Sequence, residues 1–243
     1  MTFGSLFAGI GGLDLGLERA GMACKWQVEI DDYATRVLTK HWPDVPKYRD
    51  VRECGAHNLS HVDLICGGFP CQDVAEGGKL AGIDGQRSGL WREFSRLVGE
   101  LRPRFVLVEN VANLLFGDNG RWFGRILGDL AALRYDAEWH CIPAAAVGAP
   151  HVRDRVFVVA YANSSDSIRR RGAVQVGRIA QPREIAKARN AGRTQWRTES
   201  RPSVLAYGVP SRVEQLNGYG NAVVPQVAEF VGWQIVAFDE ATP

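Results

Sequence analysis

The chain has 243 residues, of which 46% are hydrophobic and 23% are charged, as in an ordinary globular protein of one domain carrying a small insert. Its five cysteines form no CxxC pair, so neither a disulfide framework nor a zinc site is expected. No apolar run approaches the roughly 18 residues of a membrane helix, and the first residues lack the basic and apolar regions of a signal peptide. We therefore expect a cytoplasmic protein without membrane or metal partners.

Short apolar runs alternate with amphipathic stretches over the first two-thirds of the chain. The apolar runs predict strands at residues 3–7, 24–29, 62–66, 105–108, 135–142 and 155–161. The amphipathic stretches predict helices over about 13–20, 31–41, 89–101 and 121–133. Strands that alternate with helices predict an α/β fold with a doubly wound, mostly parallel sheet.

A basic segment interrupts this pattern after Asn163. Eleven Lys or Arg against three acids give residues 164–212 a charge of +8, whereas 18 bases and 24 acids give the remainder −6. The contrast predicts a polyanionic partner held at one place, although charge alone fits a solvated, partly disordered loop equally well. The pattern resumes near Val213, with a helix expected over 224–238. We divide the chain into a main domain (1–162), a basic insert (163–212) and a C-terminal segment that rejoins the main domain (213–243).

A glycine-rich turn follows the first predicted strand and opens the first predicted helix. It reads Phe7-Ala8-Gly9-Ile10-Gly11-Gly12, which permits close approach of the backbone to a ligand. Its spacing is not the full dinucleotide fingerprint, so a nicotinamide or flavin enzyme is disfavoured. Glu29 ends the next strand and could accept the ribose hydroxyls of an adenosine ligand, and Asp50 could receive the adenine amino group. Each acid taken alone is more often an ordinary surface residue.

Two further strands are followed by groups that suit addition chemistry. Gly67-Gly68-Phe69-Pro70-Cys71-Gln72 presents a thiol beyond a buried strand, where a nucleophile is accessible. No histidine adjoins Cys71, so the thiolate must arise by other means, such as a helix N-terminus or the substrate. Glu109, in Glu109-Asn110-Val111, ends another strand and could face Cys71 across one cleft. A thiolate that attacks an electron-poor ring, with an acid that protonates it, fits this pair.

Two motifs near the end of the chain are less specific. Arg153 and Arg155 lie two residues apart at the start of a strand, so both side chains could point the same way and reach a phosphate or a base oxygen. A simple charge pair at a strand edge is the more frequent meaning of such a pattern. Gly218-Tyr219-Gly220-Asn221-Ala222-Val223-Val224-Pro225, here called the closing segment, predicts a glycine turn followed by a helix with proline near its start.

Together these motifs resemble the cytosine-5 DNA methyltransferase family of bacterial or phage type, over residues 5–162 and 213–238. The resemblance implies a Rossmann-like methyltransferase fold, S-adenosylmethionine as cofactor and a small target-recognition region in the place of the basic insert. It implies the catalytic residues Cys71, Glu109, Arg153 and Arg155. The implied cofactor contacts are Phe7, Ala8, Gly9, Gly11, Gly12, Glu29, Asp50, Val51, Pro70, Leu90, Asn221 and Val223. Gln72 and Arg169, Arg170 and Arg171 are the expected DNA contacts.

The resemblance implies that a cytosine is flipped out of double-stranded DNA and methylated at carbon 5 through an adduct with Cys71. We also expect a monomer, and such enzymes can be accompanied by a cognate restriction endonuclease. Three features depart from the family pattern: His151 stands where glutamine is usual, Asp73-Val74-Ala75 follows the Pro-Cys-Gln motif, and the insert is short. A tRNA cytosine methyltransferase on the same fold and a non-catalytic nucleic-acid binder are the alternatives.

Overall fold

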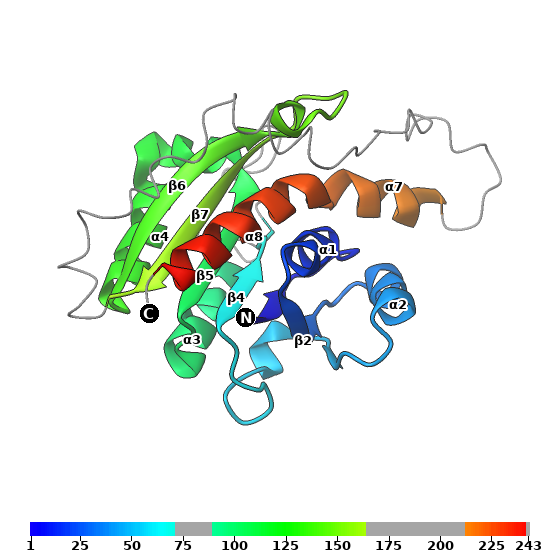
Figure 1. Ribbon diagram of the computed structural model, residues 1–243, viewed down its shortest axis with the longest axis horizontal. Coiled ribbons are helices and arrows are strands. Elements are labelled where there is room, and N and C mark those ends of the chain that lie inside the picture. The colour runs from blue at the N-terminus through cyan, green and yellow to red at the C-terminus, as the bar shows by residue number, and fades with distance from the viewer. Residues whose placement is uncertain (71–88, 164–211, 242–243) are drawn as a thin grey trace.

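The computed structural model describes residues 1–70, 89–163 and 212–241 (Figure 1). Its centre is a seven-stranded sheet in the order β3-β2-β1-β4-β5-β7-β6. The strands are β1 (Thr2–Leu6), β2 (Ala23–Val28), β3 (Lys47–Tyr48), β4 (Leu64–Gly67), β5 (Phe105–Val111), β6 (Tyr135–Pro143) and β7 (Asp154–Ala162). Strands β1 to β5 pair in parallel, whereas β7 runs antiparallel to both of its neighbours. The predicted doubly wound, mostly parallel sheet is confirmed.

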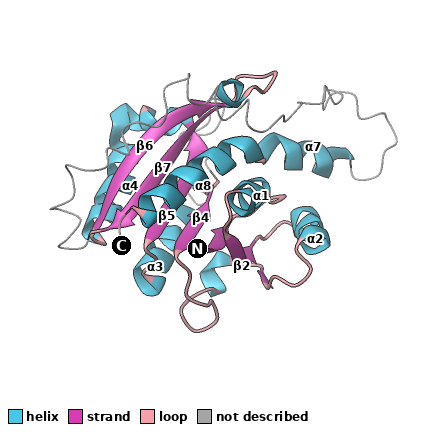
Figure 2. Cartoon of the chain, in the orientation of Figure 1, coloured by secondary structure: helices cyan, strands magenta, loops and turns pink. Residues whose placement is uncertain are grey.

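Helices pack on both faces of the sheet (Figure 2). They are α1 (Gly12–Arg19), α2 (Asp32–His41), α3 (Leu90–Leu101), α4 (Arg121–Ala132), α7 (Arg212–Asn221) and α8 (Pro225–Glu240), with short 3-10 turns at Val51–Glu53, Ala112–Leu115, Gly117–Gly120 and Ala144–Val147. One core cluster joins α3 and α4 to the sheet, and a second joins α1 and α8 to the opposite face. Because side chains alternate along a strand, neighbours such as Val106 and Leu107 serve different clusters.

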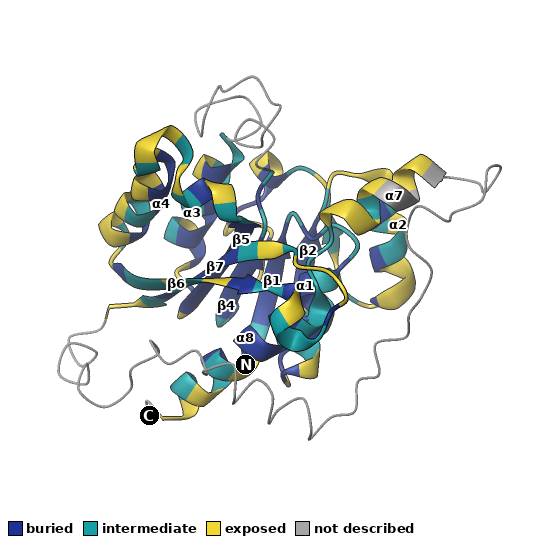
Figure 3. Ribbon diagram, turned by 90° about the horizontal axis from the view of Figure 1, so that it is seen from above, coloured by how far each residue is buried: buried dark blue, intermediate teal, exposed yellow. Residues whose placement is uncertain are grey.

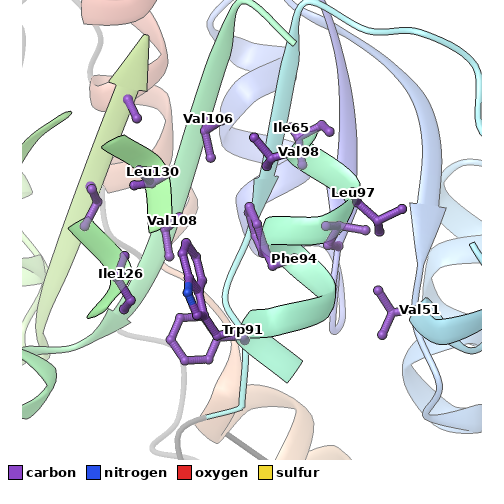
Figure 4. Close-up of a cluster of buried hydrophobic side chains, with 14 of the residues drawn as sticks. Val51, Ile65, Trp91, Phe94, Leu97, Val98, Val106, Val108, Ile126 and Leu130 are labelled. Carbon is purple, nitrogen blue, oxygen red and sulfur yellow. The ribbon is translucent and has the colours of Figure 1, made fainter. Parts of the chain in front are cut away.

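The amphipathic pattern of α3 explains why this helix forms and where it docks. Trp91, Phe94, Leu97 and Val98 are buried and lie on one side of the helix, because residues three or four apart share a face. Figure 4 shows these side chains meeting those of the sheet and of α4. Full burial of a side chain of this size contributes about 1.5–3 kcal/mol. Figure 3 shows the same division across the molecule, with buried strands between helices whose outer faces are exposed.

Helix α7 corrects one prediction about the closing segment. Gly218 and Gly220 lie in the last turns of α7 instead of in a glycine turn, and the chain turns only afterwards, before Pro225 begins α8. Packing against α2 accounts for the difference, since tertiary contact overrides the weak helix propensity of glycine. A Cβ atom at Gly218 would lie 3.1 Å from Ile10 and 3.3 Å from Tyr33, so the glycine permits this close packing.

Strand β5 is longer than the sequence predicts. It continues through Glu109 and Asn110 to Val111, because β7 pairs with it along this whole length, from Phe105 opposite Tyr161 to Val111 opposite Arg155. The acid motif is therefore part of the sheet and not of a loop beyond it.

The C-terminal segment returns to the start of the chain. Helix α8 packs directly along α1, where a Cβ atom at Gly16 would lie 2.4 Å from both Ala228 and the carbonyl oxygen of Pro225. Residues 164–211 lie outside the described parts, so the three-part division of the chain stays a prediction.

Candidate active site

The predicted cofactor and catalytic motifs gather at one edge of the sheet. The glycine turn follows β1, Glu29 follows β2, and Phe69 and Pro70 follow β4, while Glu109 lies near the end of β5. Because these strands are parallel neighbours, their carboxyl ends lie side by side. This is the edge at which open α/β sheets bind ligands.

The glycine turn has a backbone that few side chains could adopt. Phe7, Gly9 and Gly11 have φ angles of 53°, 56° and 84°. The Gly9 N–H donates a 2.7 Å hydrogen bond to Oε2 of Glu29, which ties the turn to the end of β2. A Cβ atom at Gly12 would lie only 2.2 Å from the carbonyl oxygen of Val223, so this glycine lets the closing segment approach the turn.

The two predicted cofactor acids are already ordered by the protein. Glu29 is half-buried, and its second oxygen accepts a 2.8 Å hydrogen bond from the Asp31 N–H. Asp50 accepts a 3.0 Å hydrogen bond from the Arg52 N–H and pairs with the guanidinium, with 2.6 Å between Oδ2 and Nη2. The hydrogen bonds from Arg52 lower the pKa of Asp50. A ligand that reaches Asp50 must therefore share this carboxylate with the Arg52 guanidinium.

These residues fit an adenosine-type cofactor. A Cβ atom at Gly9 would meet no described residue within 4 Å, and the Glu29 carboxylate, a hydrogen-bond acceptor, is bonded to this turn. Asp50 follows β3, the strand that pairs with β2. The neighbouring predicted contacts are hydrophobic: Ala8 and Val51 are buried, and Leu90 packs against the core at the start of α3. Val223 is partly buried beside Gly12, whereas Asn221 is exposed at the end of α7.

Glu109 is a buried carboxyl group beside a cation. It is 7% exposed, and Nε of Arg155 lies 3.2 Å from its Oε1. The Nε–H does not point at that oxygen, which accepts no hydrogen bond within the described structure, so the contact is an ion pair only. Burial raises the pKa of Glu109 to about 7, and the charges of Arg155 and Arg153 oppose part of this rise. Glu109 can therefore hold a proton at a pH where an ordinary carboxyl group has lost it.

The strand that leads toward Cys71 passes directly over this carboxyl group. Gly67 of β4 pairs with Val108 of β5, which places Gly68 next to Glu109. A Cβ atom at Gly68 would lie 2.7 Å from Oε2 of Glu109, so only glycine fits there without displacing the carboxyl. Residue spacing does not predict this contact, since the contact depends on the register of β4 against β5.

Asn110 holds the next residue of the same path. Its Nδ2 donates a 3.1 Å hydrogen bond to the carbonyl oxygen of Phe69, and its Oδ1 accepts a 2.8 Å hydrogen bond from the Val111 N–H. The Phe69 ring is buried and lies 5.6 Å from the Trp91 ring. The chain is thus anchored up to Pro70. Cys71 and Gln72 lie outside the described residues, as do Arg169, Arg170 and Arg171.

The two arginines make different contacts, because Arg153 does not lie on the extended strand that their spacing predicts, although the charges of both act on Glu109. Arg153 precedes β7 and has a φ of 37°, so it is not part of the extended strand. Its Nη1 donates to the carbonyl oxygen of Gly220 (3.0 Å) and its Nη2 to that of Ala222 (2.7 Å). Arg155 turns toward Glu109 instead. Burial lowers the pKa of Arg153, with the charge of Arg155 adding to the effect.

Comparison with known proteins agrees with this arrangement. Residues 1–203 match the model of a family described as C-5 cytosine-specific DNA methylase. The chain belongs to this family. It is 32% identical over 166 residues to the type II methyltransferase M.DsaV of Dactylococcopsis salina, covering 68% of this chain and 47% of that protein. It is 31% identical over 163 residues to M.HhaI of Haemophilus parahaemolyticus, covering 67% and 50%. The chain thus spans about half the length of these relatives.

A solved structure also shows a likeness in fold. The Entamoeba histolytica methyltransferase EhMeth superposes with a TM-score of 0.66 over 100% of this chain and 99% of its own, at 15% identity. At that identity the likeness concerns the fold alone. In the part of the chain that the structure describes, no helix is long and apolar enough to cross a membrane. The same residues contain no group of three or more His, Cys, Asp or Glu arranged to hold a metal ion.

Proposed function

We propose that this protein is a DNA (cytosine-5)-methyltransferase that acts on a flipped-out cytosine in duplex DNA. The observation that carries the proposal is the position of Glu109. It is a buried carboxyl group with a pKa of about 7, paired with Arg155 and covered by the backbone of Gly68, three residues before Cys71. An acid that can give up a proton at neutral pH lies beside the chain that leads to a thiol.

The cofactor would lie over the glycine turn, with its ribose near Glu29 and its adenine near Asp50. S-adenosylmethionine supplies an electrophilic methyl group when it is bound. Support comes from the lack of any described residue within 4 Å of a Cβ atom at Gly9, and from the two ordered carboxylates. Val223, in the C-terminal segment, would form the opposite side of this pocket. It can lie so close to the glycine turn because Gly12 has no Cβ atom, which would lie 2.2 Å from the Val223 carbonyl oxygen.

In the proposed mechanism the protein residues act on the cytosine ring in a fixed order. The Cys71 thiolate forms a bond to carbon 6, and Glu109 gives its proton to ring nitrogen 3, so that the electron pair reaches carbon 5. Arg155 hydrogen-bonds the base oxygen and keeps Glu109 oriented. Carbon 5 would then take the methyl group that bound S-adenosylmethionine supplies, which leaves S-adenosylhomocysteine, and the proton on ring nitrogen 3 would return to Glu109. A base then removes the carbon-5 proton, and that electron pair restores the double bond between carbons 5 and 6 as the bond from carbon 6 to Cys71 breaks. Flipping is required because the ring carbons are inaccessible within a base stack.

We assign Arg153 to holding the closing segment, because both of its terminal nitrogens donate to carbonyl groups of that segment. The basic insert would bind the DNA backbone, with Arg169, Arg170 and Arg171 on phosphates and Gln72 near the flipped base. We further propose that the enzyme acts on double-stranded DNA in the cytoplasm and that it is a monomer.

The test is methyl transfer from labelled S-adenosylmethionine to duplex DNA, with tRNA as the competing substrate. We expect incorporation into DNA only, and Cys71→Ala should abolish it while cofactor binding persists. Cys141→Ala is the matched control, because this cysteine is exposed on the edge strand β6 and should leave activity unchanged. Duplex containing 5-fluorocytosine should form a covalent complex with the wild type, since the fluorine at carbon 5 cannot be removed. Turnover by Cys71→Ala, or transfer to tRNA instead, would reject the proposal.

A further inference from the structure

A fully buried carboxylate lies beneath the first turn of α1, outside the catalytic residues. Asp14 is 0% exposed, as are its partners Ser5 and Gln27. Its Oδ2 accepts a 3.0 Å hydrogen bond from the Ser5 hydroxyl, and its Oδ1 accepts a 2.7 Å hydrogen bond from Nε2 of Gln27. The Cys24 thiol donates a longer and weaker hydrogen bond, of 3.9 Å, to the same Oδ1. The two short hydrogen bonds define a group of three residues, Asp14, Ser5 and Gln27. Asp14 forms no salt bridge with any described residue. These three residues are called the Asp14 cluster.

The Asp14 cluster joins β1, β2 and α1. The glycine turn lies between β1 and α1, and Glu29 follows β2. Ser5 of β1 pairs with Gln27 of β2 in the sheet, and Asp14 approaches both from α1. Two residues beyond Ser5 the chain enters the glycine turn, and two residues beyond Gln27 it reaches Glu29. The hydrogen bonds from Ser5 and Gln27 to Asp14 thus hold the bases of these two proposed cofactor-binding segments at a set separation.

The free-energy cost of burying the Asp14 carboxylate argues against a role in stability alone. Burial of a carboxylate without a cation costs free energy, and well-packed apolar residues of the same volume often give equal or greater stability. In addition, Oε1 of Gln27 is buried and accepts no hydrogen bond from the described residues. A polar arrangement with this cost is typical of residues retained for a function.

We propose that Asp14 is a positioning residue for the cofactor pocket, which it holds in its binding geometry as the ionised acceptor between Ser5 and Gln27. This inference rests on the proposed use of S-adenosylmethionine. Cofactor binding should then favour the ionised form of Asp14, because only that form accepts from both partners. Proton uptake by Asp14 should release the pocket and weaken binding.

The surroundings of Asp14 place this effect at mildly acid pH. Burial raises the pKa of Asp14 to about 6, and the hydrogen bonds from Gln27 and Ser5 oppose part of the rise. Other charged or titratable groups face it from its own helix (Glu18), from β2 (Cys24), from β4 (Cys66) and from β3 (Lys47). The Lys47 ammonium donates to the carbonyl oxygens of Trp42 and Val45, so it does not pair with Asp14. The ionised form is lost as pH falls through about 6, and affinity should fall with it.

The experiment is calorimetric titration of the full chain with S-adenosylmethionine, without DNA, at about pH 5.5, 6.5 and 7.5. Asp14→Asn keeps the shape but cannot ionise, and its amide opposes the amide of Gln27. We expect Kd at the highest pH to rise about tenfold, the loss expected for one hydrogen bond to a charged group, and the acid-side weakening of the wild type to disappear. Turnover at saturating cofactor should stay within about twofold of the wild type, because the catalytic residues are untouched.

Leu17→Ala is the matched control for a general loss of stability. Leu17 is equally buried on the same helix but contributes to the apolar cluster shared with α8. It should lower Tm at least as much as Asp14→Asn and leave Kd unchanged. If both variants weaken binding alike, or if Asp14→Asn binds like the wild type at every pH, the positioning role is wrong. Should Asp14→Asn not fold, Ser5→Ala removes one of the two donors and should give a smaller rise in Kd. A wild type that binds no S-adenosylmethionine would instead reject the proposed function.

Discussion

Replacing Glu109 with Gln should remove a pH dependence of stability that the burial of this carboxyl group creates. Its pKa rises from the ordinary 4.5 to about 7 on folding, chiefly through burial. The folded state therefore holds a proton that the unfolded state has lost between these two pH values. The stabilisation is complete below pH 4.5 and is lost as pH rises through about 7.

The magnitude follows from the two pKa values. A carboxyl whose pKa moves from 4.5 to about 7 lowers the free energy of unfolding by about 3 kcal/mol as pH rises across that interval, at about 1.4 kcal/mol per pH unit. A neutral amide cannot contribute this slope. The difference in unfolding free energy between Glu109→Gln and the wild type should therefore grow by about 3 kcal/mol in favour of the variant from pH 4.5 to above 7.

The assay is urea unfolding of both proteins at half-unit pH steps, with the m-values compared at each pH. The other buried acid, Asp14, also has a raised pKa, but it is present in both proteins and cancels in the difference. A difference that is independent of pH would refute the account of Glu109 as a buried acid that titrates near neutrality.

In the same variant, Glu109→Gln, turnover should fall far more than cofactor affinity. A loss confined to cofactor binding would place Glu109 in the cofactor pocket and not beside the cytosine ring.

Three further predictions concern the residues around Glu109 and the insert. Arg153→Met should cost roughly 1.5–3 kcal/mol in urea unfolding and weaken S-adenosylmethionine binding, because the closing segment loses both of its donors; unchanged affinity by calorimetry would contradict this. Gly68→Ala should lower kcat by displacing the Glu109 carboxyl, which lies 2.7 Å from the new Cβ, and an unchanged kcat would show that the carboxyl is not needed where it lies. Neutralising Arg169, Arg170 and Arg171 should weaken DNA binding for all sequences alike and flatten the slope of log affinity against log salt by about 0.9 for each phosphate group that these side chains neutralise, whereas an unchanged slope would favour a solvated loop.

Local patterns in the sequence predict the parts of this site that depend on one element at a time. The glycine turn, Glu29 and Glu109 each come directly after or within an apolar run, and parallel strands bring such positions to a common edge. The family resemblance adds their roles. The order of the strands in the sheet is enough to bring the glycine turn, Glu29 and Glu109 to the same edge.

The contacts that sequence reasoning missed depend on register and on unusual backbone. The approach of Gly68 to Glu109 requires the register of β4 against β5, and the contact of Asp14 with Gln27 requires the packing of α1 against β2. Residue spacing contains neither. Arg153 was expected on an extended strand, but its φ of 37° turns the side chain toward the closing segment. The helical glycines of α7 depend on packing against α2, which local propensity opposes.

The close approach between Gly12 and Val223 has a consequence for the newly made protein. About 210 residues separate the two sides of the proposed cofactor pocket. At about 5–20 residues per second, a ribosome needs on the order of ten to forty seconds to make that stretch. During this time α1 is complete but lacks α8, whose side chains cover Leu13 and Leu17 in the finished molecule. The nascent chain therefore carries an uncovered apolar helix face for most of its synthesis, and this face is where we expect chaperones to bind first.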